Sequence, residues 1–351
     1  MNDIEKVCVE ENTTISESIK RLDEAGEKIL LVTKSQKLTG VITDGDIRRW
    51  ILKKGSFDET VNKIMHRNPQ IVDEGNTGKA KWIMLERHLE AIPVVDKNNI
   101  PIDIIFLRDI ILPEQRKYEQ VKVPVVIMAG GKGTRLYPYT NILPKPLIPI
   151  GSMTILERII DSFRKNGCKD FLLILNYKKN LIKAYLEEQE KPYRIQYIEE
   201  SDFFGTCGGI RLVQDKLKQT FFVSNCDVLL DIDFAELLQF HQLEQNEITV
   251  VTSLKHMQIP YGVVELDKGG EVKKISEKPC LNYNMNTGIY VMEPSVLNDI
   301  PLNQVFHVTD LMNILLKEHR RVGAYPIMEK CWQDMGEIDE MQKMLNVFQD
   351  K

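Results

Sequence analysis

A glycine-rich turn that ends in an arginine is the part of the sequence best suited to chemistry on phosphates. An apolar stretch at 125–128 runs into the segment Gly-Gly-Lys-Gly-Thr-Arg at 130–135. Glycines let the backbone approach a ligand and point N–H groups at phosphate oxygens, and Arg135 adds a fork of donors. The segment is not G-x-G-x-x-G, because Leu136 occupies the last position, and no Gly-Lys-Ser/Thr makes it a Walker A loop. The turn therefore disfavours a dehydrogenase or a P-loop ATPase.

Lys145 is a second candidate for phosphate binding. It stands between Pro144 and Pro146, ten residues after Arg135. The prolines restrict the backbone on both sides of the lysine. In isolation the pattern indicates a rigid loop with a solvent-exposed lysine, whereas beside the glycine-rich turn it indicates a lysine held on the phosphates of a nucleotide.

Two carboxylates are candidates for binding a metal ion. Asp227 follows the apolar stretch 221–224, and ligands of open α/β sheets bind at the carboxyl ends of strands. Asp334 lies more than 100 residues later. Because Mg²⁺ binds one or two protein carboxylates together with phosphate oxygens, we expect both to hold Mg²⁺. Asp231 and Asp233 instead fit the start of a helix.

The composition is that of a globular protein, with 43% hydrophobic and 28% charged residues and a net charge of −5. This charge argues against a nucleic-acid binder, and no apolar run approaches the roughly 20 residues that a membrane span needs. The six cysteines form no C-x-x-C pair, so we expect reduced thiols and a cytoplasmic protein. The six histidines show no paired spacing, and we assign none to chemistry.

Strands and helices alternate from residue 123 onward. The apolar patterns predict strands at 123–128, 171–176, 194–199, 220–224, 248–253, 262–267 and 288–292. They predict helices at 155–166, 178–188, 208–218, 234–244 and 310–318. This alternation predicts an α/β fold with a parallel or mixed sheet that helices cover on both faces.

The first third of the chain contains an internal repeat. At an offset of 63 residues, 29–33 matches 92–96, and Val9, Thr14 and Asp46 match Val72, Thr77 and Asp109. Each copy contains a strand, an amphipathic helix (15–25 or 78–88), two short strands and a further helix, so the copies must pack as one module. We expect this module at 1–115, with repeats at about 1–62 and 63–115, a linker at 116–122 and a second domain at 123–351.

In its second domain the chain resembles the sugar-1-phosphate nucleotidylyltransferases. G-G-x-G-T-R-L and P-K-P-L are intact, and later segments keep the order of the family's motifs. These segments are 205–209 (G-T-C-G-G), 225–227 (N-C-D), 261–264 (Y-G-V-V), 277–279 (E-K-P), 286–290 (N-T-G-I-Y) and 332–336 (W-Q-D-M-G). The resemblance covers 123 to about 345. It implies a Rossmann-like (GT-A-like) nucleotidyltransferase domain, with a mixed sheet sandwiched by helices.

The resemblance also implies roles for individual residues. The implied catalytic residues are Arg135, Lys145, Asp227 and Lys278. The residues expected to contact the nucleotide are Gly130, Gly131, Gly133, Thr134 and Gly205. Those expected to contact the sugar phosphate are Gly262, Glu277, Lys278 and Asn286, and Asp227 and Asp334 are expected to bind Mg²⁺. Cys207, Gly209 and Asn225 depart from the commonest family residues, which leaves the base and the sugar open.

The repeat resembles a tandem pair of CBS domains. Residues 40–46 match the signature G-x-x-T-x-x-D, which implies that Thr43 faces a phosphate and Asp46 the ribose of an adenosine nucleotide. In the second copy Asp103 and Phe106 replace the glycine and the threonine, so we expect at most one nucleotide site, built around the first copy. The alternative is a module that serves only dimerisation. In both cases we expect a homo-oligomer formed through the CBS pair.

Together the two resemblances predict an enzyme that makes an NDP-sugar and pyrophosphate from an NTP and a sugar 1-phosphate. A CBS pair ahead of a transferase resembles the bacterial guanylyltransferases of legionaminic acid synthesis, so we expect GTP and glucosamine 1-phosphate. The alternatives are a mannose-1-phosphate guanylyltransferase, another sugar nucleotidylyltransferase, or a non-catalytic nucleotide-binding regulatory protein. An adenosine nucleotide on the CBS pair would regulate the transferase.

Overall fold

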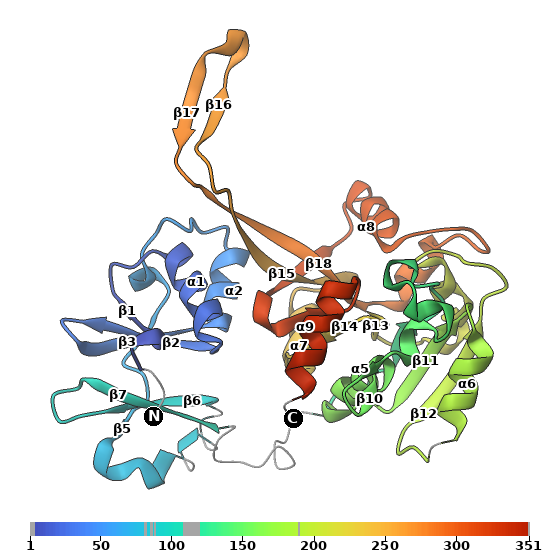
Figure 1. Cartoon of the computed structure of the whole chain (residues 1–351), viewed down its shortest axis with the longest axis horizontal. Helices are drawn as coiled ribbons and strands as arrows, with labels where there is room; N and C mark the ends of the chain where they lie inside the picture. The colour runs from blue at the N-terminus through green and yellow to red at the C-terminus, as the bar shows by residue number, and fades with distance from the viewer. Residues whose placement is uncertain are drawn as a thin grey trace. The chain divides into compact units, whose positions relative to one another are not determined.

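The computed structural model describes residues 4–80, 83–84, 87, 89–107, 120–188 and 190–349. They form two compact units (Figure 1). The first comprises the described residues of Met1–Lys117 together with Lys255–Asn282 and Met328–Lys330; the second comprises those of Tyr118–Leu254, Tyr283–Ile327 and Cys331–Lys351. Asp109 and residues 116–119 of the predicted linker lie outside the described residues, so the proposed domain boundaries remain predictions.

Two small sheets with the same topology lie in the first unit. One contains β1 (Cys8–Glu10), β2 (Ile29–Lys34), β3 (Lys37–Thr43) and β4 (His66–Arg67); the other contains β5 (Val72–Asp73), β6 (Ala91–Val95) and β7 (Pro101–Phe106). In each sheet the first two strands pair in parallel and the second and third pair antiparallel. The pairing is interrupted after Val32 in one copy and after Val94 in the other. The predicted repeat is therefore confirmed. Between β2 and β6 the offset of the repeat is 62 residues rather than 63, because the second copy has one residue fewer before β6 than the first copy has before β2.

The helices of the first copy begin and end where local chemistry dictates. Thr14 caps α1 (Ile15–Ala25) by accepting the N–H of Glu17, and Gly26 ends it in the left-handed conformation with φ 68°. Thr43 and Asp46 form a capping box at the start of α2 (Asp44–Leu52). The structure describes a 3-10 helix at Glu74–Lys79 in the second copy, whereas residues 81, 82, 85, 86 and 88 of the predicted helix at 78–88 lie outside the described residues.

A seven-stranded sheet forms the centre of the second unit, in the order β12-β11-β8-β13-β18-β15-β19. The strands are β8 (Val125–Met128), β11 (Asp170–Leu175), β12 (Arg194–Glu199), β13 (Phe221–Asn225), β15 (Ile248–Gln258), β18 (Cys280–Met292) and β19 (Val322–Met328). The first four strands in this order are parallel, and β18 pairs antiparallel with β13. The predicted α/β fold with a mixed sheet is confirmed.

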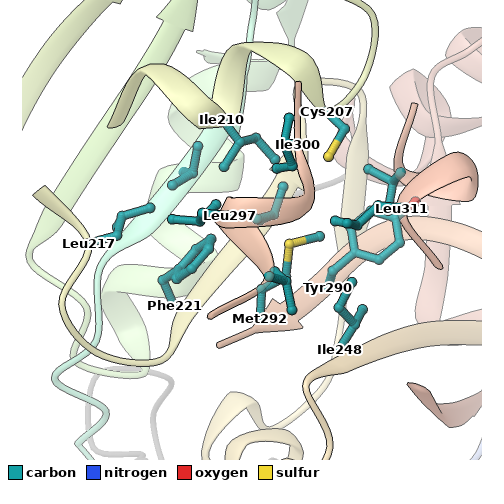
Figure 2. Packing of buried hydrophobic residues seen from close by; sticks show 14 of the residues in the cluster. Cys207, Ile210, Leu217, Phe221, Ile248, Tyr290, Met292, Leu297, Ile300 and Leu311 are labelled. Atoms are coloured by element: carbon teal, nitrogen blue, oxygen red, sulfur yellow. The ribbon is translucent and has the colours of Figure 1, made fainter. Parts of the chain in front are cut away.

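Both faces of this sheet are covered, as the two phenylalanines of β13 show. Phe221 belongs to a buried cluster on one face, shown in Figure 2, with side chains such as Leu297 and Leu311. Phe222 belongs to the other face, where its ring centroid lies 5.4 Å from that of Phe163 and 5.5 Å from that of Phe234. The helices of this unit are α5 (Ile155–Lys165), α6 (Lys179–Glu187), α7 (Phe234–Leu243), α8 (Val308–Lys317) and α9 (Ile338–Gln349).

Two predicted elements differ from the observed ones. The segment predicted as a helix at 208–218 is a 3-10 helix, Gly208–Lys216. Its opening glycines are poor helix formers and are needed for close packing, because a Cβ on Gly208 would lie 2.6 Å from the carbonyl oxygen of Gln304. The predicted strand at 262–267 is β16 (Val263–Leu266), which pairs with β17 (Val272–Ser276) in a hairpin outside the main sheet.

Within the described ranges, no helix combines the length and the apolar character that crossing a membrane would require.

Candidate active site

The glycine-rich turn and Asp227 lie at the same edge of the main sheet. The turn follows β8, and Asp227 follows the adjacent parallel strand β13. From β8 the chain continues outward to β11 and β12, and it returns to the other side of β8 to form β13. Ligands of open α/β sheets bind at such a reversal of strand order, beyond the carboxyl ends of the strands. The topology therefore places a ligand site between Gly130 and Asp227.

A short antiparallel pair brings Asp334 to Asp227. In this pair, β14 (Val228–Leu230) runs beside β20 (Trp332–Asp334), with Val228 opposite Asp334. The N–H of Met335 donates to the backbone carbonyl of Asp227 at 2.8 Å. Burial, and then the negative charge of Asp227, raise the pKa of Asp334. The two carboxylates thus form one acidic site, although they are distant in the sequence.

Lys145 supplies positive charge to this acidic site. Its Nζ lies 2.5 Å from Oδ2 of Asp227, and the two side chains are 9% and 16% exposed. The lysine is therefore not a solvent-exposed loop residue. Gly133 packs against it: an added Cβ at this glycine, which has φ 65°, would lie 3.1 Å from the Cβ of Lys145. The glycine-rich turn and the P-K-P segment are thus in contact.

A cavity of about 340 Å³ opens beside the acidic site. Four of the predicted residues line it: Arg135, Asp227, Asn286 and Asp334. The volume is in the range of small-ligand pockets. The guanidinium of Arg135 is 67% exposed and lies 3.9 Å from the carboxylate of Glu337, so a phosphate chain can reach it. The cavity thus joins a cationic group to two carboxylates.

The rest of the cavity is lined by residues to which the sequence gave no individual role. Among them, Thr206, Tyr290 and Trp332 belong to the quoted motifs, whereas His307 and Thr309 lie outside them. Nδ1 of His307 lies 3.4 Å from both the backbone nitrogen and the hydroxyl of Thr206. Thr206 follows Gly205, whose φ of 80° and close approach to Phe306 exclude a side chain. The spacing of the histidines did not reveal His307, because no second histidine lies near it in the sequence. In the structure His307 is the N-cap residue of α8.

The hydrophobic core supports this cavity directly. Figure 2 shows Cys207 and Tyr290 in the buried cluster. Cys207 follows Thr206 in the sequence, and Tyr290 ends the segment 286–290 that begins with Asn286. Asn286 donates to the Tyr290 hydroxyl at 2.9 Å and accepts the N–H of Gly288 at 2.9 Å. The core therefore fixes the position of polar groups at the cavity wall.

The other predicted sugar-phosphate residues lie in the first unit, on the hairpin segment 255–282. Glu277 and Lys278 are exposed, and Lys278 has a left-handed φ of 45°. A Cβ added to Gly262 would lie 3.0 Å from Oε2 of Glu277, so these two residues are neighbours. None of these three residues lines the cavity described above, and their role remains a prediction.

The predicted adenosine-nucleotide residues contact each other. Oδ2 of Asp46 accepts from the backbone nitrogen of Thr43 at 2.8 Å and from its hydroxyl at 2.7 Å, and Oδ1 accepts from Arg49 at 2.6 Å. Both side chains therefore cap α2. Phe106, which occupies the position of Thr43 in the second copy, is buried. This agrees with the expectation of at most one site but leaves ligand binding untested.

Asp227 and Asp334 fit Mg²⁺ by their chemistry. They are adjacent carboxylates on a polar cavity, and their mutual repulsion favours a cation between them. The described part of the chain contains no group of three or more His, Cys, Asp or Glu side chains that could bind a metal without help. A metal here would therefore depend on oxygens from its ligand, as is usual for Mg²⁺ with nucleotides.

Family comparisons agree with this geometry. The model of the nucleotidyl transferase family matches residues 124–350. This chain belongs to that family of enzymes. Its N-terminal region carries a tandem CBS pair, because the CBS domain model matches residues 2–53 and 61–112. The predicted nucleotidyl transferase domain and CBS pair are thus confirmed, whereas the narrower resemblance to guanylyltransferases of legionaminic acid synthesis stays a prediction.

Curated relatives of this nucleotidyl transferase include mannose-1-phosphate guanyltransferases. The protein of Aspergillus oryzae is 32% identical over 221 residues, which cover 60% of each chain. A probable mannose-1-phosphate guanylyltransferase 1 of Oryza sativa subsp. japonica is 34% identical over 234 residues, which cover 64% of each. The chain thus spans about 60% of the length of the curated relatives that it matches.

Solved structures share the fold of the second unit. HddC from Yersinia pseudotuberculosis has a TM-score of 0.51 and 23% identity, and the match covers 64% of this chain and 99% of HddC. A putative glucose-1-phosphate thymidylyltransferase from Bacillus anthracis has a TM-score of 0.53 and 22% identity, with coverage of 65% and 96%.

Proposed function

We propose that this nucleotidyl transferase moves a guanylyl group from GTP to a sugar 1-phosphate. The observation that carries the proposal is the convergence of Arg135, Asp227 and Asp334 on one cavity, with Lys145 paired to Asp227. Cations and paired carboxylates at the switch point of the sheet are what a triphosphate with its Mg²⁺ requires. The remaining roles, those of the glycines and of the sugar-phosphate residues, are proposed as the sequence motifs imply them.

The reaction needs no protein nucleophile. An oxygen of the sugar phosphate attacks the α-phosphorus of GTP in line and forms a new P–O bond. The bond from the α-phosphorus to the bridging oxygen breaks, and pyrophosphate leaves with the electron pair. Such transfers depend on positioning and on neutralisation of charge. Mg²⁺ on the two carboxylates would neutralise phosphate charge.

In this scheme Arg135 and Lys145 hold the triphosphate and neutralise the pyrophosphate as it leaves. Gly130, Gly131, Gly133 and Thr134 bring backbone N–H groups to the phosphates, and Gly205 adjoins the nucleoside. Asn286 faces the sugar from the cavity wall. For Gly262, Glu277 and Lys278 we propose only the contact with the sugar phosphate that their sequence motifs imply.

The comparisons favour guanine and mannose. The curated relatives named above are mannose-1-phosphate guanyltransferases, and one HddC structure is a complex with GMP-PN at 23% identity and a TM-score of 0.50. The expectation that glucosamine 1-phosphate is the acceptor rests only on the order of the two domains. We therefore propose mannose 1-phosphate as the better-supported acceptor and keep glucosamine 1-phosphate as the second.

Pyrophosphate release tests the proposal. The full chain with Mg²⁺ is assayed with ATP, CTP, GTP, TTP and UTP against the 1-phosphates of mannose, glucosamine, N-acetylglucosamine and glucose. We expect release with GTP and one sugar phosphate. Folded protein that releases nothing in any combination would overturn the proposal, and a GTP titration of that protein would then test the non-catalytic alternative.

A further inference from the structure

The hairpin of β16 and β17 carries an exposed apolar face. Val264 lies opposite Ile275, and Leu266 lies opposite Val272. Because side chains alternate along a strand, Val264 and Leu266 point to the same side, and each shares that side with the residue opposite it. The exposed fractions are 49% for Val264, 63% for Leu266, 56% for Val272 and 67% for Ile275. We call these four side chains the hairpin face.

A β-bulge in β17 is what places its two apolar residues on the same side. Val272 and Ile275 are three positions apart, a spacing that would put them on opposite sides of a regular strand. The pairing register shifts between them, so Lys273 is an extra residue without a partner across the hairpin. The backbone is therefore built to gather the four apolar side chains on one side.

Exposure of the hairpin face to water is unfavourable. In the part of the chain that the structure describes, β16 and β17 make up a two-stranded sheet of their own, labelled in Figure 1. A hairpin of two strands is marginally stable in water unless its apolar side packs against another surface. The hairpin face exposes apolar area on the order of a few hundred Å², the size at which a patch marks an interaction site.

We propose that the hairpin face is an interface between two copies of this chain, in which the hairpin of one copy packs against that of its partner. Two identical apolar faces are complementary to each other about a two-fold axis. Two stacked sheets pack about 10 Å apart with their inner side chains in contact. None of the four side chains has a role in the proposed reaction, so the inference is independent of the proposed function.

The charges of the hairpin favour a second copy as the partner. Between β16 and the end of β17, three acidic residues are balanced by three lysines: Glu265, Asp267 and Glu271, and Lys268, Lys273 and Lys274. Two copies of a segment with no net charge do not repel each other. Anionic lipid surfaces and nucleic acids attract segments with an excess of basic residues, which this hairpin lacks. On the side opposite the hairpin face, Glu265 lies across from Lys274, and this polar side remains in water.

The size of the hairpin face predicts a weak and reversible association. A stable interface buries about 800 Å² on each partner, and the hairpin face offers less. We therefore expect an association step that doubles the mass of the protein in the micromolar concentration range, whatever oligomer the CBS pair forms. Sedimentation velocity of the full chain as a function of concentration is the measurement. A mass that does not change with concentration would overturn the proposal.

A double substitution on the hairpin face tests which surface drives this step. Leu266→Ser combined with Ile275→Ser should weaken the association about 10-fold or more, because apolar side chains at the centre of an interface contribute most of the binding. The matched control is Glu265→Ser combined with Lys274→Ser, on the opposite side of the same strands, which should associate as wild type does. An unchanged association constant in the first variant would contradict the assignment and leave the CBS pair as the interface.

Crosslinking tests the assignment without disturbing the apolar face as a whole. Ile275→Cys should give covalent dimers with a short bismaleimide, well above the wild-type background, whereas Lys274→Cys, which points to the other side, should not. If the thiol introduced at position 275 gives no dimers and resists a simple maleimide, the face is covered within its own chain and the proposal is wrong. The proposal also fails if that thiol reacts freely with the simple maleimide but gives no dimers.

Discussion

The ammonium of Lys145 and the carboxylate of Asp227 form a largely buried ion pair with an N–O distance of 2.5 Å. The proposed reaction requires each partner for a different purpose: the lysine for phosphate oxygens and the aspartate for Mg²⁺. The pair therefore holds both side chains beside the cavity, with their charges mutually neutralised. Removal of either partner should affect catalysis more than folding, provided that the replacement remains polar.

Asp227→Asn tests the metal site. The amide retains the shape of the side chain but loses the charge that attracts Mg²⁺, so we expect turnover to fall on the order of 100-fold or more. Pyrophosphate release as a function of Mg²⁺ concentration is the measurement. Asp231→Asn, an exposed aspartate four residues further on, is the control and should behave as wild type. An active Asp227→Asn enzyme with normal Mg²⁺ dependence would contradict the assignment.

Two glycines of the site should respond differently to alanine. Gly205 has φ 80°, and a Cβ there would lie 2.6 Å from the carbonyl oxygen of Phe306, so Gly205→Ala should lower the free energy of unfolding by about 1–3 kcal/mol. Gly131 has no described heavy atom within 4 Å of such a Cβ, so Gly131→Ala should leave unfolding unchanged. If the turn contacts phosphates, Gly131→Ala should nevertheless weaken GTP binding several-fold. Urea unfolding and calorimetry measure the two effects, and wild-type GTP affinity in Gly131→Ala would argue against a phosphate contact.

Glu200 makes stability depend on pH. Burial raises its pKa from 4.5 to about 7, so the folded protein binds this proton more tightly than the unfolded chain does. The stabilisation is fully present below pH 4.5 and is lost as the pH rises through 7, at a cost of roughly 1–3 kcal/mol. Glu200→Gln removes this loss, so without nucleotide it should be more stable than wild type at pH 8 but not at pH 4.5. Urea unfolding at the two values checks this, and an equal difference at both would refute it.

Asp46 tests whether the CBS pair senses adenosine nucleotides. We propose that AMP, ADP or ATP changes transferase turnover and that Asp46→Ala abolishes the change. The variant also loses the capping box of α2, which should cost about 1 kcal/mol of stability. Asp44→Ala is the matched control, because Asp44 begins the same helix but accepts only from Gly45 in the contacts described. No effect of any adenosine nucleotide on wild-type turnover or melting temperature would count against sensing and favour a module for dimerisation.

The sequence predicted the elements whose signals are local. The apolar strand before Gly130, the periodic helix at 155–166 and the repeat were each visible in a short window, and the structure confirms them. The helix expected at 208–218 forms as a 3-10 helix, because its two opening glycines are poor helix formers and Gly208 packs against Gln304, which is almost 100 residues away in the sequence. The strand at 262–267 pairs only within its hairpin, which periodicity cannot distinguish from a strand of the main sheet.

The site was predicted where motifs mark it and missed where only tertiary contacts do. Arg135, Asp227, Asn286 and Asp334 line one cavity, although spacing alone gave no reason for the two aspartates to meet. Pairing of β14 with β20 brings them together. His307 was missed because a single histidine before a helix has many structural explanations in a sequence.

The fate of the α-phosphate of GTP tests the central claim most directly. GTP labelled at the α-phosphorus is incubated with the full chain, Mg²⁺ and mannose 1-phosphate or glucosamine 1-phosphate, and the products are separated. We predict that the label passes into a GDP-sugar while unlabelled pyrophosphate is released in equal amount. Label that remains in GTP, or that passes only into GDP or GMP with both sugar phosphates, would contradict guanylyl transfer to these acceptors.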